Sequence, residues 1–203
     1  KVRAKYDGLA RFFRTYFYLI KIIDLGDVPW YDYVLTEQDT EGLTKERDSR
    51  QFVFSKMLED IDYAIANLDE SKSITRVTKW TALALKSRMC LFEGTYRKYH
   101  GIEGWEDILD LCASASEELM TNSGYKLYTS TSDKAYQELF VKEEADPGEI
   151  ILAREYITGL LDHSVNTYTL SPSWGRPGVT RDFVNNYLMT NGSRFTDISN
   201  YEK

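Results

Sequence analysis

The chain of 203 residues contains only two cysteines and two histidines. Zinc sites draw their ligands mainly from Cys and His at short spacings, and nothing around His100 and His163 has such a spacing. Cys90 and Cys112 fall in two predicted helices. Buried free thiols are the favoured interpretation, and a disulfide between adjacent helices stays open. The sequence therefore predicts no metal and no cofactor, and the cysteines do not indicate a compartment.

The chain also lacks a basic excess and a long apolar run. Its net charge is −7, whereas a nucleic-acid binder needs a face rich in Lys and Arg, as does direct docking on anionic lipid. The most apolar stretch, residues 12–25, is interrupted by Arg14, Lys21 and Asp24, which argues against a membrane span. Residues 1–6 do not resemble a signal peptide. We expect the chain to be a partial piece of a larger protein.

Catalytic motifs are missing as well. The sequence has no G-x-S-x-G, no P-loop and no H-E-x-x-H. Acidic pairs such as Asp60/Asp62 and Glu117/Glu118 lie on predicted helices, where neighbouring residues point apart. Nothing places two carboxylates at the separation that glycoside hydrolysis needs. We interpret these pairs as solvated faces and predict that the protein is not an enzyme.

Four amphipathic helices are present instead, predicted from apolar residues that recur at spacings of three and four. Thr78 is a plausible N-cap of the third helix, and Asn122-Ser123-Gly124 ends the fourth. The linker between the first two helices is long and charged. The four helices are predicted over about residues 9–25, 49–69, 78–96 and 105–121.

The first helix ends at Gly26, because glycine can take the left-handed conformation that closes a helix. Pro29 then prevents the helix from resuming. The residues assigned to its apolar, core-facing side are Leu9, Phe12, Phe13, Tyr16, Phe17, Ile20 and Ile23.

The alternation of long helix and partner helix is typical of tetratricopeptide-like helical pairs, two of which fit residues 3–121. The remainder, about residues 122–203, is rich in loops, with short extended segments at 148–156 and 168–170. Thr180 is expected to cap a last helix over residues 181–189. The predicted fold class is mainly α: an α-α superhelix of tetratricopeptide-like pairs with loop-rich insertions and a few short strands.

Four separated motifs resemble signatures of the SusD/RagB family. They lie at residues 14–29, 76–94, 149–151 and 180–192, in the family's order. The matching residues are Arg14, Tyr18, Gly26-Asp27-Val28-Pro29, Arg76, Thr78, Ala82, Leu85, Arg88, Gly94, Glu149, Ile150, Ile151, Thr180, Phe183, Val184, Tyr187, Met189 and Gly192. Val179 stands where the family commonly has Pro, and Asn191 stands where it commonly has Asp.

Members of this family are surface glycan-binding lipoproteins of the Bacteroidetes. The resemblance implies that residues 1–203 are part of a single domain of that type, anchored by lipid to the outer face of the outer membrane. It implies non-catalytic oligosaccharide binding and delivery to a SusC-like TonB-dependent porin. The anchoring Cys is not in this chain. The alternative function is a tetratricopeptide-type scaffold that binds a peptide or another protein.

Aromatic residues on loops are the expected glycan contacts, because the C–H faces of sugars lie against flat rings while polar neighbours bind the hydroxyls. One such loop is residues 30–33, where the alternative for Trp30 is to plug the turn against the first helix. Another is residues 173–176, where the alternative for the Trp is to cover the end of the last helix. The ligand-binding candidates are Trp174, Arg176, Tyr31, Tyr33, Trp30 and Tyr168.

Overall fold

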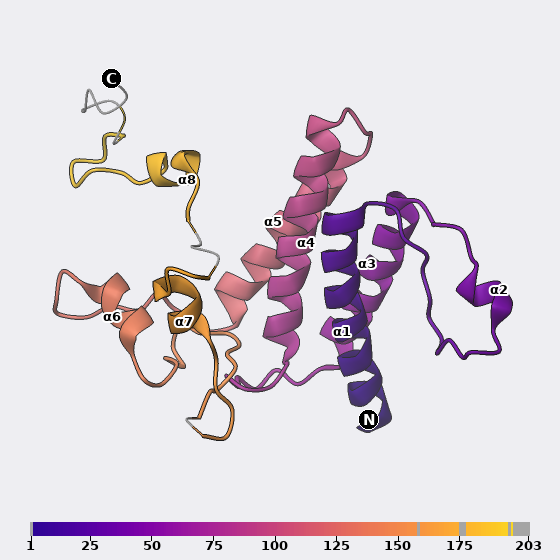
Figure 1. Ribbon diagram of the computed structural model, residues 1–203, viewed down its shortest axis with the longest axis horizontal. Helices are drawn as coiled ribbons and strands as arrows, with labels where there is room; N and C mark the ends of the chain where they lie inside the picture. The colour runs from indigo at the N-terminus through magenta and orange to yellow at the C-terminus, as the bar shows by residue number, and fades with distance from the viewer. Residues whose placement is uncertain (1, 158, 175–177, 195, 197–203) are drawn as a thin grey trace. The chain divides into compact units, whose positions relative to one another are not determined.

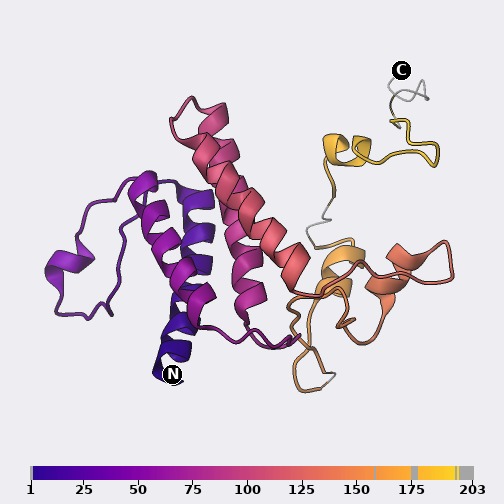
Figure 2. The same cartoon turned by 180° about the vertical axis from the view of Figure 1, so that it is seen from behind.

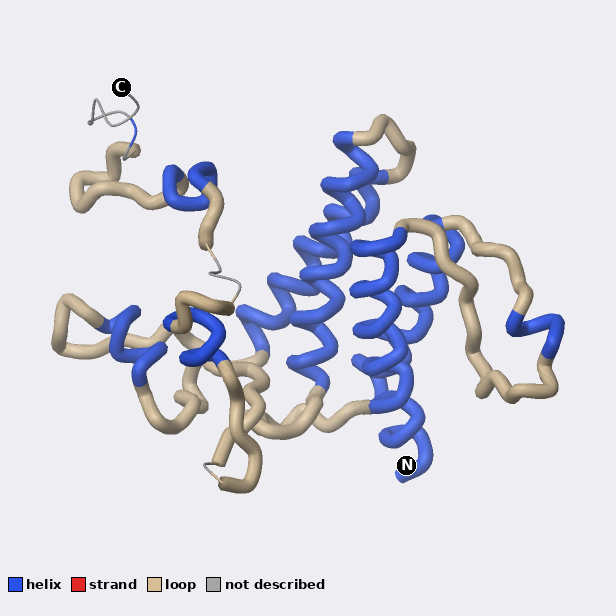
Figure 3. The backbone as a smooth tube through the Cα atoms, viewed as in Figure 1, coloured by secondary structure: helices blue, strands red, loops and turns tan. Residues whose placement is uncertain are grey.

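The computed structural model describes residues 2–157, 159–174, 178–194 and 196. The chain divides into two compact units, Lys1–Arg154 and Glu155–Lys203, and each unit is described by itself. Regular secondary structure in the described residues is helical (Figure 3), and β pairing there is limited to isolated bridges. The prediction of a mainly α fold is confirmed.

The first unit is built on four long helices that pack in consecutive pairs. α1 packs against α3, α4 packs against α5, and α3 contacts α4 to join the two pairs (Figure 1). Figure 2, seen from behind, shows α5 running along α4. This arrangement is the tetratricopeptide-like one expected from the sequence. The helices of this unit are α1 (Val2–Leu25), α2 (Thr40–Leu43), α3 (Arg50–Asn67), α4 (Lys79–Tyr99), α5 (Trp105–Asn122) and α6 (Ala135–Val141).

Local signals set the ends of these helices. Gly26 has φ of +73° and donates its N–H to the Ile22 carbonyl oxygen at 3.3 Å, which closes α1. Ser49 caps α3. The predicted cap at Thr78 is confirmed, and it forms a capping box with Thr81 at the start of α4.

The core lies between the four long helices, and each fully buried aliphatic or aromatic side chain contributes about 1.5–3 kcal/mol of transfer free energy. The cysteines are free thiols, and Cys90 is buried in this core. The largest fully buried apolar side chains are Ile22, Val53, Phe54, Met57, Ile61, Met89 and Cys90.

The predicted core face of α1 is wrong for five of its residues, which are exposed. The side that packs on α3 carries small groups: a Cβ on Gly8 would lie 3.5 Å from the Ala64 Cα, and Thr15 donates to the Met57 carbonyl oxygen at 3.4 Å. α1 is apolar on both sides, so periodicity alone does not identify the side that packs. The exposed residues are Phe13 (42%), Tyr16 (43%), Phe17 (56%), Ile20 (42%) and Ile23 (47%).

The loop-rich remainder differs from the prediction in detail. Residues 148–156 are held by single bonds, such as that from the Ala153 N–H to the Ile74 carbonyl oxygen at 2.8 Å, and form no strand. The extended segment predicted at 168–170 is wrong, because these residues end α7 (Val165–Leu170). There the Tyr168 N–H bonds the carbonyl oxygen of Ser164, four residues earlier, at 2.8 Å.

The last predicted helix is also shorter than expected. Thr180 caps it as predicted, but α8 (Arg181–Asn185) stops before residue 189. Leu188 instead forms an isolated bridge with Arg194, so that Asn191-Gly192 make a tight turn between them. Gly192 has φ of +82°, which favours glycine there. Among the described helices, none has both the length and the apolarity that a bilayer crossing requires.

Candidate functional site

The loop that carries Trp30, Tyr31 and Tyr33 is fixed at its base by α1. The Tyr18 hydroxyl donates to the Pro29 carbonyl oxygen at 3.0 Å and accepts the Tyr31 N–H at 2.8 Å. These two bonds hold the chain against α1 as it leaves the turn. Burial raises the pKa of the Tyr18 phenol, which keeps this hydroxyl protonated.

The end of the loop between α1 and α3 is bonded to the beginning of the same loop. The Trp30 N–H donates to Asp48 Oδ2 at 2.7 Å, and Asp48 forms an isolated bridge with Val28. The Lys45 ammonium lies 2.6 Å from the same carboxylate oxygen and holds the pKa of Asp48 below its usual value. The loop therefore begins and ends at one place.

The turn that follows α1 is also bonded to α3. The Arg50 N–H donates to Asp27 Oδ1 at 2.8 Å, and the Arg50 guanidinium donates to the Ile22 carbonyl oxygen at 2.7 Å. Arg50 Nε lies 2.7 Å from Glu93 Oε2 on α4. One residue thus connects the end of α1, the start of α3 and the middle of α4.

Trp30 is packed against α1, which matches the structural alternative given for it. Its side chain is 8% exposed, and its ring centroid lies 4.4 Å from that of Tyr18. Arg14 Cζ lies 4.9 Å from the Trp30 ring centroid, a cation–π distance. A ligand contact by Trp30 stays a prediction, restricted to the small part of the indole that solvent reaches.

A bidentate ion pair joins α1 to α3 beside this indole. Arg14 Nε and Nη2 lie 2.6 and 2.7 Å from the two carboxylate oxygens of Asp60, whose side chain is 3% exposed. The hydrogen bond to Asp60 raises the pKa of Arg14. Arg11 Nη1 adds a longer contact of 3.4 Å to the same carboxylate. Asp60 is therefore a buried, paired group, and its interpretation as a solvated face was wrong.

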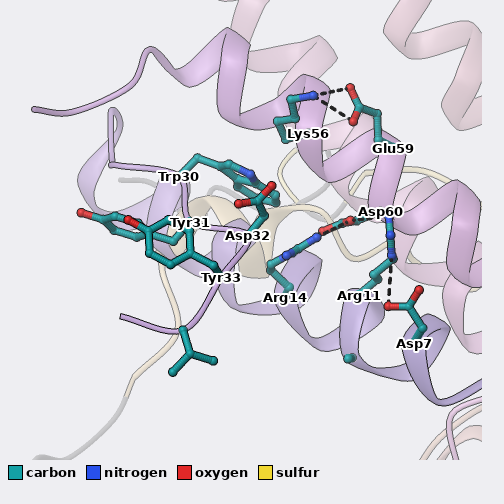
Figure 4. A pocket seen from close by; sticks show the side chains of 12 residues that line it. Asp7, Arg11, Arg14, Trp30, Tyr31, Asp32, Tyr33, Lys56, Glu59 and Asp60 are labelled. Carbon is teal, nitrogen blue, oxygen red and sulfur yellow. Dashed lines mark hydrogen bonds and ion pairs between the residues drawn. The ribbon is translucent and has the colours of Figure 1, made fainter. Parts of the chain in front are cut away.

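A pocket of about 490 Å³ opens between α1, α3 and the start of the loop, and we call it the α1–α3 pocket. Figure 4 shows the rings of Tyr31 and Tyr33 on the loop side and the charged groups of the two helices opposite. The lining residues are Asp7, Ala10, Arg11, Arg14, Trp30, Tyr31, Asp32, Tyr33, Val34, Lys56, Glu59 and Asp60.

Tyr31 and Tyr33 form an edge-to-face pair, with ring centroids 6.0 Å apart and planes at 86°. The Tyr31 hydroxyl donates to the Gly42 carbonyl oxygen at 2.6 Å, which fixes that ring, while Tyr33 is 55% exposed. A hydrogen bond with Asp39 raises the pKa of Tyr33. An exposed ring beside a fixed one gives this loop an apolar surface with polar edges.

A second cavity, of about 400 Å³, borders the same aromatic residues from the loop side. Trp30, Tyr31 and Tyr33 line both this loop cavity and the α1–α3 pocket. The two cavities therefore have these three aromatic residues as a common border. The remaining residues of the loop cavity are Asp39, Glu41, Gly42 and Lys45.

The other predicted site residues lie in the second unit. Tyr168 on α7 and Trp174 in the turn after it form an edge-to-face pair, with centroids 6.2 Å apart and planes at 74°. Their side chains are 49% and 53% exposed. Arg176 lies outside the described residues. The structure thus brings the candidates together as two aromatic groups, one in each unit, and a ligand role for either stays a prediction.

The charged residues of the α1–α3 pocket were missed as site residues by the sequence analysis. Arg14 was quoted only as a motif residue, and Asp32, Lys56 and Glu59 were given no role. One signal was available for Asp60: it interrupts the buried row of α3 between Met57 and Ala64. An acidic residue in such a row needs a cationic partner on the neighbouring helix.

Comparison with known proteins finds SusD-like proteins both by sequence and by structure. No family sequence model matches the chain. A protein named SusD-like protein from Bacteroides ovatus is 26% identical over 150 residues, which are 73% of this chain and 26% of that protein. The crystal structure of a SusD-like protein from Bacteroides fragilis is 27% identical, with a TM-score of 0.58, over 77% of this chain and 28% of that one.

A further crystal structure, described as being with xylogluco-oligosaccharide, shares the fold. It is 23% identical with a TM-score of 0.55, over 77% of this chain and 30% of that one. The chain thus spans between a quarter and a third of the length of these similar proteins.

The fold and the loop together define a class: a scaffold of tetratricopeptide-like helical pairs that presents aromatic residues on an irregular connection. Within that class, the named relative and the solved structure are both SusD-like proteins, and the chain is similar to them in sequence and in fold.

Proposed function

We propose that the protein to which this chain belongs binds an oligosaccharide without changing it, and that the α1–α3 pocket takes part in the binding. The observation that carries this proposal is the Tyr31–Tyr33 pair, which lines one side of a cavity with charged groups opposite (Figure 4). The cavity of about 490 Å³ falls within the usual range for small-molecule sites, about 300–1,000 Å³. The xylogluco-oligosaccharide named for one structure of the same fold supports a glycan as the ligand class.

Binding would use two kinds of contact. The apolar C–H face of a sugar ring lies on the exposed Tyr33 ring, and the hydroxyls bond to polar groups such as Asp32 and Glu59. Tyr31 is already fixed by its bond to Gly42, so little side-chain freedom is lost when the ligand binds. Micromolar or weaker affinity, about −8 kcal/mol or less favourable, suffices for capture and release.

A binding role without catalysis is favoured by the state of the acidic groups. Asp60 is held by Arg14 in a bidentate ion pair, and Glu59 is held by both of its oxygens to Lys56. Both carboxylates are thus occupied by cations and are not arranged as the acid and base or nucleophile pair that glycoside hydrolysis uses.

We infer that the complete protein is an outer-membrane, surface-exposed lipoprotein, and that residues 1–203 are part of one SusD/RagB-like domain of it. A SusC-like TonB-dependent porin is the proposed recipient of the glycan. The similarity to SusD-like proteins supports both proposals. Two measurements test these proposals. The full-length protein should co-purify with a large outer-membrane porin. It should also stay with the outer membrane during mild washing, and its release by that washing would contradict a lipid anchor.

Binding of xylogluco-oligosaccharide, measured by isothermal titration calorimetry on the full-length protein, tests the site. Tyr33→Ala should weaken binding by about tenfold or more, because stacking of a ligand ring on an aromatic side chain is worth about 1–3 kcal/mol. Phe13→Ala is the matched control, since it removes an exposed ring from α1. Equal affinities for both variants and the parent protein would remove the α1–α3 pocket from the proposal.

The exposed apolar side of α1 favours a second candidate, a scaffold that binds a peptide or protein. Exposed aromatic and aliphatic side chains at helical spacing, such as Phe17 and Ile20, can receive an amphipathic helix. Replacing both by Ser should abolish capture of such a partner while glycan binding persists. Loss of glycan binding in the same variant, with an unchanged melting temperature, would join the two functions at one surface.

A further inference from the structure

The cations around the α1–α3 pocket are already neutralised by carboxylates. Arg14 makes its bidentate pair with Asp60, at 2.6 and 2.7 Å. Lys56 Nζ lies 2.8 and 2.9 Å from the two oxygens of Glu59. An anionic sugar binds best to a cation that has no carboxylate partner, because an ion pair exerts little net attraction on an incoming anion.

Arg11 is shared between two acidic groups. Its Nε lies 3.4 Å from Asp7 Oδ1, and its Nη1 lies 3.4 Å from Asp60 Oδ1. Arg11 Cζ also sits 4.2 Å from the Tyr63 ring centroid. With Arg11, all three cations that line the pocket have a carboxylate partner.

Asp32 adds an unbalanced negative charge at the loop side of the pocket. Its carboxylate is exposed, and it makes no hydrogen bond or ion pair with any other residue in the described part of the chain. Figure 4 shows it between the indole of Trp30 and the guanidinium of Arg14. Its charge is close enough to Arg14 to raise the pKa of that group. The lining therefore carries four carboxylates, Asp7, Asp32, Glu59 and Asp60, against the three cations.

The loop cavity on the other side of Tyr33 has the same sign. Asp39 and Glu41 line it together with a single cation, Lys45. That cation is engaged with Asp48 at 2.6 Å. A ligand that crosses Tyr33 from one space to the other meets excess negative charge on both sides.

We propose that this site selects uncharged glycans and rejects chains that carry uronic acids or sulfate, with Asp32 as the specificity-determining residue. The proposal rests on the proposed function and names its ligand class. An ionised carboxylate accepts hydrogen bonds from two adjacent sugar hydroxyls, so Asp32 attracts a neutral ring. The same charge repels a carboxylate or sulfate held at that position, and the paired cations do not compensate.

The test compares one oligosaccharide in two charge states. The probes are a neutral xylogluco-oligosaccharide and the same oligosaccharide with its free primary hydroxyls oxidised to carboxylates. Calorimetry on the full-length protein should show the neutral form binding about tenfold tighter or more at low salt, with a smaller difference at 0.5 M NaCl, because salt screens exposed charges.

Asp32→Asn should weaken the neutral ligand and narrow the difference between the two probes. Asp110→Asn on α5 makes the same change in net charge away from the pocket and should leave both affinities unchanged. Equal binding of the two probes, or tighter binding of the oxidised one, overturns the charge selection while glycan binding stands. An unchanged difference in Asp32→Asn overturns the role of Asp32, and binding of neither probe removes the proposed function together with this inference.

Discussion

Glu93 provides the sharpest test of how the scaffold is held together. Its carboxylate is fully buried on α4, with one oxygen 2.7 Å from Arg50 Nε and the other 2.9 Å from Arg97 Nε. The Arg50 side chain is itself only 7% exposed, and its Cζ lies 3.9 Å from the Tyr96 ring centroid. Two guanidinium groups thus depend on one carboxylate for their neutralisation.

Glu93→Gln keeps the shape of the side chain and removes its charge. Breaking a buried ion pair by removing one partner costs about 3–5 kcal/mol, because the other charge remains buried without compensation. Small domains unfold with about 5–15 kcal/mol in total, so this loss is a large fraction of the stability. With a urea m-value of about 2 kcal/mol/M, the unfolding midpoint should fall by about 2 M.

The assay is urea unfolding of the variant and the parent, followed by far-UV circular dichroism. Glu59→Gln is the matched control, because Glu59 pairs with Lys56 on the surface and is 62% exposed. An exposed pair contributes about 0–1 kcal/mol, so the control should shift the midpoint by less than about 0.5 M. Equal shifts in the two variants would refute the reasoning that burial makes the Glu93 pair indispensable.

Three further outcomes are expected. Leu85→Ala should lower the unfolding free energy by about 2–5 kcal/mol because that side chain is buried. Tyr16→Ala, on the exposed side of α1, should lower it by less than about 1 kcal/mol. Equal urea midpoints for the two variants would show that the buried and exposed helix faces are misassigned. Burial raises the pKa of Cys90 to about 12, so its contribution to stability is present below about pH 9 and lost as pH rises toward 12, and iodoacetamide at pH 8 should label Cys112 but not Cys90 in the native state. Trp174→Ala should weaken glycan binding with little loss of stability, and a fall in melting temperature with normal binding by the remaining folded protein would count against it.

The helices could be predicted because their ends are set by local chemistry. The cap at Thr78 and the glycine stop at Gly26 act through neighbouring backbone groups, which a sequence displays directly. The packing side of α1 could not be predicted in the same way, since both of its sides are apolar. The small residues Gly8 and Thr15 decide the outcome, because they let α3 approach closely.

The aromatic part of the candidate site could be predicted, and its charged part could not. Three aromatic residues lie within residues 30–33, and the sequence shows this cluster directly. The pairing of Arg14 with Asp60, 46 positions apart, depends on how α1 and α3 meet. Likewise, the engagement of Lys56 with Glu59 decides whether that cation is available, and a sequence gives no indication of it.

The loop between α1 and α3 is closed at its base by hydrogen bonds, so changes in the loop are separated from changes in the helices. The bond from the Trp30 N–H to Asp48 and the bond from the Arg50 N–H to Asp27 close residues 31–47 into a ring-like insert. Doubling the length of such an insert costs only about 0.6 kcal/mol in closure entropy. The residues at its tip can therefore be exchanged or lengthened while the helices beneath keep their arrangement.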